Sequence, residues 1–230
     1  MLEALGYGAL AASSLLIGAL LGLARDLPRR AVGLVLGFGA GALISSVAFE
    51  LAEDGVRIGG APAVGVGLAA GALTYYLCDG LVESRSGGAG GALALGAFLD
   101  GIPEQLVLGI GLTTGRGVSV GLLGAIFVSN LPEAIGASTG MRSAGRSRKT
   151  IVRLWLAVTV VLTLATVVGY GIADSASDEL LGGVNGFAAG ALLVMLVDSM
   201  VPEAARQGGR PAGLVTALGF ALAAGMSGIS

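Results

Sequence analysis

The chain has 230 residues, of which 54% are hydrophobic and 12% are charged, whereas a soluble domain has about 25% charged residues. This composition excludes an ordinary soluble enzyme and a disordered chain, and the net charge of -2 without a basic tract argues against nucleic-acid binding. The chain has no histidine and one cysteine, Cys78. A Ser-His-Asp triad, an HExxH zinc site and an intrachain disulfide are therefore excluded, and no enzymatic activity is predicted.

Eight apolar stretches are long enough to cross a membrane as helices, which takes about 20 residues each. Short links with glycine or charged residues separate them. The sequence therefore predicts an all-α, polytopic membrane protein with a single transmembrane domain over residues 1–230. The first stretch lacks the basic flank of a cleaved signal peptide, so it is expected to be a span. The predicted spans are 4–24, 31–52, 61–81, 92–113, 118–138, 150–172, 180–201 and 211–229.

Basic residues in the links predict the orientation of the chain. They concentrate in alternate links, and the remaining links contain only Arg57 and Arg116. Because lysine and arginine favour the cytoplasmic side, we expect a multi-pass plasma-membrane protein with both termini outside. The basic residues assigned to the cytoplasmic side are Arg25, Arg29, Arg30, Arg85, Arg142, Arg146, Arg148, Lys149, Arg153, Arg206 and Arg210.

Two short sequences predict an internal repeat. Residues 37–43 are GFGAGAL and residues 186–192 are GFAAGAL, at corresponding points of the second and seventh spans. Four complete spans lie between them, so the two copies are expected to cross the membrane in opposite directions, as in an inverted repeat. The alternative is a chance similarity between helices rich in glycine and alanine.

A second repeated pattern places acidic side chains inside the membrane. Residues 98–104 are FLDGIPE in the fourth span, and residues 127–133 are FVSNLPE in the fifth. In each, a polar residue lies four positions before a glutamate, on the same face of the helix. A proline before the glutamate is expected to bend the helix and free a carbonyl group. Charges at this depth are costly, so the cluster needs a proton or a cation to neutralise it.

Carboxylate, hydroxyl and amide oxygens of this kind suit a divalent cation. The alternative is a pair of protonated carboxyl groups that hold two bent helices together. Gln105 could be a further ligand or form a hydrogen bond between helices. Glu50 and Asp198, expected near the cytoplasmic ends of their spans, could line an exit path or simply reach the interface. The predicted metal ligands are Asp100, Glu104, Ser129, Asn130 and Glu133.

At these residues the chain resembles the ZIP (Zrt/Irt-like) family of divalent-metal transporters, as a divergent member without histidine. The family's HNxPEG-like motif in span 4 and HxxPEG-like motif in span 5 match residues 100–105 and 129–134. Its Gly-rich pattern in span 2 and its PEA-containing pattern in span 7 resemble residues 37–49 and 186–204. The resemblance implies eight helices in a 3+2+3 inverted-repeat arrangement, a metal site between spans 4 and 5, and a homodimer.

The resemblance further implies elevator-type alternating access, in which spans 1, 4, 5 and 6 move against the others. The histidines of the family correspond here to Asp100 and Ser129, and oxygen ligands shift preference toward Mn, Fe(II) or Mg and away from Zn. Some members bridge a second metal through an acidic residue in span 6. Leu162 roughly matches that position.

The leading hypothesis is a transporter of divalent cations (Zn, Mn, Fe(II), Cd or Mg) in which the metal is cargo and no cofactor is permanently bound. Its expected partners are the cation, the lipid bilayer and a second copy of the chain. Two alternatives remain open. One is a transporter of a non-metal solute on the same scaffold, such as a proton-coupled organic solute. The other is a non-transporting membrane protein.

Overall fold

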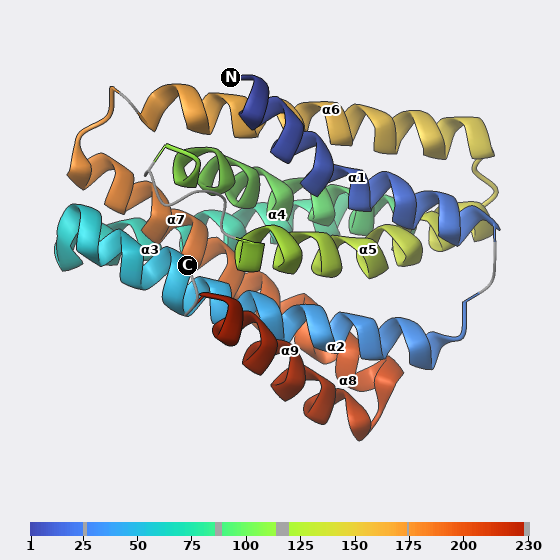
Figure 1. Ribbon diagram of the computed structural model, residues 1–230. Helices are drawn as coiled ribbons and strands as arrows, with labels where there is room; N and C mark the ends of the chain where they lie inside the picture. Colours follow the sequence, from blue (N-terminus) through green and yellow to red (C-terminus); the bar gives the residue numbers. More distant parts are fainter. Residues whose placement is uncertain (25–26, 86–88, 114–119, 174, 228–230) are drawn as a thin grey trace.

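The apolar stretches form long helices, because in lipid every backbone polar group must find its partner within the segment. The computed structural model (Figure 1) describes residues 1–24, 27–85, 89–113, 120–173 and 175–227, without the side chains of 82–85, 89–97, 99, 100, 120 and 121. Within these ranges all regular elements are helices. They are α1 (Leu2–Ala24), α2 (Arg29–Ser46), η1 (Val47–Glu53), α3 (Asp54–Arg85), α4 (Ala89–Gly111), α5 (Val120–Ser143), α6 (Arg148–Ala173), α7 (Asp178–Met195), η2 (Leu196–Met200), α8 (Val201–Gly208) and α9 (Pro211–Ser227).

Four segments of the described chain are long and apolar enough to cross a membrane: Leu2–Ala24, Arg29–Leu81, Arg148–Ala173 and Asp178–Gly208. The second has 53 residues, enough helix for two crossings of a hydrocarbon core about 30 Å thick. It is broken at Gly60, where φ is 81° and ψ is 158°. This backbone conformation suits glycine. The segment therefore consists of two helical parts that meet at a turn at Gly60.

The same turn occurs a second time, at Gly209, where φ is 66°. Both turns lie within an Arg-x-Gly-Gly-x-Pro sequence, at residues 57–62 and 206–211. The spacing between these two sequences equals the spacing between the two Gly-rich heptapeptides. The internal repeat therefore extends from each heptapeptide through the following turn.

Two further features recur within the repeat. A π-helix follows each heptapeptide, η1 after α2 and η2 after α7, and both start at the same distance from it. An acidic residue then pairs with the arginine three positions later: Asp54 lies 3.3 Å from Arg57, and Glu203 pairs with Arg206. α2 and α7 run in opposite directions (Figure 1), so the two copies are inverted relative to each other.

The two copies interlock through close helix contacts. α2 packs along α9, and α7 packs along α3. A methyl group added at Gly41 would meet the carbonyl oxygen of Thr216, and one added at Gly190 would meet that of Leu68. Each Gly-rich helix thus packs on the helix that follows the turn of the other copy, and small residues permit this close approach.

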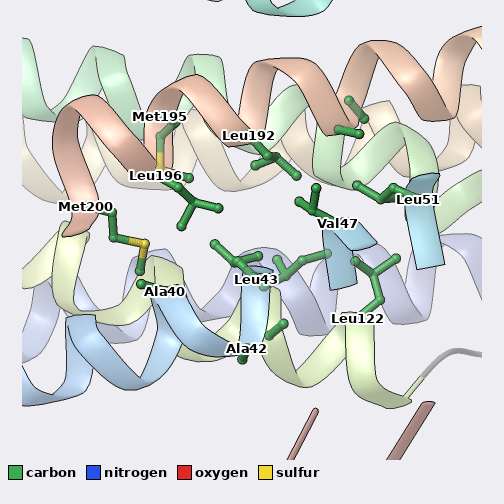
Figure 2. Packing of buried hydrophobic residues seen from close by; sticks show 14 of the residues in the cluster. Ala40, Ala42, Leu43, Val47, Leu51, Leu122, Leu192, Met195, Leu196 and Met200 are labelled. Carbon is green, nitrogen blue, oxygen red and sulfur yellow. The ribbon is translucent and has the colours of Figure 1, made fainter. Parts of the chain in front are cut away.

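Buried apolar side chains form two clusters. The first lies where α2, η1, α7 and η2 meet α4 and α5, and Leu43, Leu122 and Leu192 are among its members (Figure 2). The second surrounds Trp155 and is built from α1, α5 and α6, with Phe98 and Ile102 of α4 packed against it. The bundle of α1, α4, α5 and α6 therefore has a core of its own, and the first cluster lies along its contact with the repeat helices.

Two arginines join three helices of this bundle at one end. Arg142 of α5 and Arg148 of α6 both donate hydrogen bonds to the carbonyl oxygen of Leu23, at 3.1 and 3.0 Å. The last carbonyl groups of a helix have no partner within that helix. These two side chains supply one for α1 and tie its end to α5 and α6.

Candidate metal site

The candidate site is built on two neighbouring helices that each contain a Pro-Glu pair. Pro103 and Glu104 lie in α4, Pro132 and Glu133 lie in α5, and neither proline ends its helix. Glu104 is 1% exposed and Glu133 is half-buried. The two side chains are close enough for their charges to interact. Two carboxyl groups from different helices thus share one location inside an apolar bundle.

Ser129 and Asn130 lie one turn before Glu133 and are buried. The hydroxyl of Ser129 donates to the carbonyl oxygen of Ile126 at 3.1 Å, which leaves the serine oxygen able to accept. Among the described residues, the side-chain nitrogen of Asn130 and Oε2 of Glu133 have no hydrogen-bond partner. Unpaired buried polar atoms are costly, so this location suits a polar or charged ligand.

Asp100, the third predicted acidic ligand, has its backbone in α4 one turn before Glu104, and its side chain lies outside the described residues. Among the side chains that are described, no three Asp, Glu, Cys or His gather closely enough to hold a metal ion. The pair of Glu104 and Glu133 is therefore what the described side chains contribute, and the role of Asp100 stays a prediction.

Gln105 is fully buried, and its side-chain oxygen accepts a hydrogen bond from the hydroxyl of Thr166 in α6. The sequence left two roles open for this residue, a metal ligand or a bond between helices. The structure has the bond between helices, which joins α4 to α6 directly behind Glu104.

Replacing Thr166 with valine keeps the shape of the side chain and removes this hydrogen bond. Because buried Gln105 would lose its partner, we expect the variant to be less stable by about 1 kcal/mol and its Tm to fall by about 3 °C. Thermal unfolding of the detergent-purified protein measures this. The matched control is Thr163→Val, because among the described residues that hydroxyl bonds to the Thr159 carbonyl of its own helix and not to a second helix. An equal change in both variants would contradict the prediction.

Glu50 and Asp198 lie in η1 and η2. The prediction that both are near the cytoplasmic ends of their spans is wrong. Each residue is near the C-terminal end of its own helix, and those ends point in opposite directions (Figure 1). Glu50 is half-buried and Asp198 is exposed, and neither forms a group of three acidic side chains with Glu104 and Glu133.

Gly39, which the sequence did not indicate as a site residue, lies against Ser129 and Met200. A Cβ atom added at Gly39 would lie 2.9 Å from the Cα atom of Ser129 and 3.0 Å from the methyl group of Met200. Gly39 belongs to α2 and Met200 to η2. The repeat helices therefore cover the site at Ser129, and the distance between α2 and α5 has no room for a side chain at position 39.

The fold and the site together define a helical membrane protein with a pair of carboxyl groups buried between two of its helices. No family model matches the chain. A protein of Arabidopsis thaliana named "Putative zinc transporter" is 28% identical to it over an alignment of 193 residues, and the match covers 76% of this chain and 30% of that protein. The chain thus spans about 30% of the length of this relative. A transporter is not an enzyme, so this likeness supports the expectation that the chain has no enzymatic activity.

Proposed function

We propose that the protein transports divalent metal cations across a membrane in the manner of the ZIP family. The observation that carries the proposal is the pair of carboxyl groups of Glu104 and Glu133, which meet inside an apolar bundle. No lysine or arginine occurs in residues 92–113 or 118–138 that could neutralise them. A divalent cation would neutralise them, and the similarity to a protein named "Putative zinc transporter" supports a metal as the cargo.

In this proposal Glu104 and Glu133 are the paired ligands, Asp100 is a third charged ligand, and Ser129 and Asn130 supply neutral oxygens. An oxygen-only ligand set favours Mn, Fe(II) or Mg, while zinc prefers nitrogen and sulfur ligands. The relative is named for zinc. Metals of both kinds therefore belong in any test of the cargo.

The arrangement of the helices supports eight crossings in a 3+2+3 order. The inverted copies, α2 with α3 and α7 with α9, enclose the pair of α4 and α5 that carries the carboxyl groups. The bundle of α1, α4, α5 and α6 has its own apolar core and meets the repeat helices along a second one. Movement of this bundle along that contact is our proposed route to alternating access, and the working unit is proposed to be a homodimer in the plasma membrane with both termini outside.

The flux of metal should depend on pH, because protons and the metal compete for the same carboxyl groups. We expect flux into proteoliposomes to be highest near pH 8 and to fall as the pH is lowered to about 5, since protonated carboxyl groups bind the cation weakly. The measurement is the initial rate of uptake over that range, with the pH equal on both sides. A rate that does not change with pH would contradict the proposed site.

A further inference from the structure

Two adjacent serines near the end of α2 are buried without a hydrogen-bond partner. Ser45 and Ser46 are 0% and 1% exposed, and neither hydroxyl has a partner among the described residues. Other buried serines, such as Ser14 and Ser129, bond to a carbonyl group of their own helix. An unpaired buried hydroxyl is costly, so these positions suit a polar or charged ligand.

The position of Ser46 connects it to the candidate metal site. It follows Gly39 by seven residues, which in a helix is about 700°, so the two lie within about 20° on one face and about 10 Å apart. Gly39 faces Ser129 of α5. Beyond that contact α5 continues beside η1, where Leu122 and Val47 belong to the same cluster (Figure 2). Ser46 therefore lies on the face of α2 that faces α5.

The other unpaired hydroxyls lie elsewhere. Ser45 is about 100° further round α2, toward α9. Ser138 of α5 follows Ser129 by nine residues, about two and a half turns, and so faces away from α2. Glu50 follows Ser46 by four residues, which is about one turn of helix. It therefore lies nearer than Ser46 to the end of the molecule that carries both chain termini (Figure 1).

The inverted copy provides an internal comparison. In the repeat register, Gly39 corresponds to Ala188 and Ser46 to Met195. Met195 is 1% exposed and lies in the apolar cluster beside Leu196 (Figure 2). One copy therefore carries a buried hydroxyl at this position, and the other carries an apolar side chain.

We propose that Ser46 lines the route by which the cation passes between the carboxyl site and the molecular end that carries the chain termini. The proposal rests on the proposed function. The hydroxyl oxygen of Ser46 takes the place of part of the hydration shell of a divalent cation, which prefers oxygen ligands. At the corresponding position of the other copy, the apolar side chain of Met195 offers no such oxygen. In this proposal the cation reaches Ser129 and the carboxyl site from the side of Ser46.

Thiol labelling tests the route. The chain has a single cysteine, Cys78, so replacing it leaves the introduced cysteine as the one thiol that can react. In a Cys78→Ser background, Ser46→Cys is reconstituted and treated with a membrane-impermeant methanethiosulfonate on one face at a time. We expect modification from the face that carries the termini, slowed at least about fivefold by Mn²⁺. Ser14→Cys, at a buried and paired serine of α1, should stay unmodified. Modification only from the opposite face, or none in the folded protein, would overturn the proposal.

A second pair of variants measures transport. Ser46→Leu should lower Mn²⁺ flux at least about tenfold, because an apolar side chain would obstruct the route, whereas Ser14→Ala should leave flux unchanged. Full flux in a folded Ser46→Leu protein would overturn the route and leave the carboxyl site intact. Absence of flux in the unmodified chain for every metal would instead remove the proposed function, and the route with it.

Discussion

Replacing either Glu104 or Glu133 with alanine is expected to lower metal flux by at least about 100-fold. The two carboxyl groups meet in an apolar bundle and are the acidic pair that the described side chains bring together. A cation that loses one of its charged ligands in such surroundings loses much of its stabilisation. Initial rates of uptake in proteoliposomes measure the effect.

Two controls separate the loss of a ligand from the loss of the fold. Glu53→Ala removes an exposed carboxylate of η1 that pairs with Arg57 at 3.2 Å and belongs to neither of the helices that carry the carboxyl pair, so this variant should transport normally. Glu104→Gln keeps the size of the side chain and removes its charge, so it should fold and still fail to transport. If protonated carboxyl groups served only to hold the helices together, Glu104→Gln would keep its activity. Retained flux in that variant would contradict the site.

Replacing Gly219 of α9 with alanine adds one methyl group and is expected to destabilise the folded protein. A Cβ atom at Gly219 would meet the carbonyl oxygen of Phe38, at a contact that recurs in the other copy between Gly71 and Phe187. Overpacking of a close contact typically costs about 2 kcal/mol. We therefore expect Gly219→Ala to lower Tm by about 4–8 °C in detergent.

The same helix offers matched controls for this change. A Cβ atom at Gly213 or Gly225 has no described atom within 4 Å. Alanine at those positions should be neutral or slightly stabilising, because glycine weakens the interior of a helix. Equal Tm values for Gly219→Ala and Gly213→Ala would show that the close packing of α2 on α9 does not contribute to stability.

The sequence predicted the helices well because apolar length is a direct signal for them, but it located only part of the repeat. The heptapeptides at 37–43 and 186–192 mark its beginning. The Arg-x-Gly-Gly-x-Pro sequences at 57–62 and 206–211 have the same spacing and could have marked its end. The π-helices between them have no sequence signal of their own, because they arise from packing rather than from propensity.

Part of the candidate site could be predicted from patterns in the sequence, and part depends on contacts that no pattern marks. The four-residue spacing placed Ser129 and Glu133 on one face, and the paired patterns brought Glu104 toward Glu133. The partner of Gln105 could not be predicted, because Thr166 lies on a distant helix and reaches it only through tertiary packing. For the same reason the contact of Gly39 with Ser129, which carries the inference about Ser46, appears only in the structure.

The measurement that tests the central claim most directly is metal flux into proteoliposomes of the purified chain. Zn, Mn, Fe(II), Cd and Mg would be tested in parallel, with the Glu104→Ala/Glu133→Ala double variant as the control. We predict flux of at least one of these cations that is lost in the double variant. If the folded protein carries none of the five metals, it is not a divalent-cation transporter, and transport of a non-metal solute or a role without transport would take the place of this account.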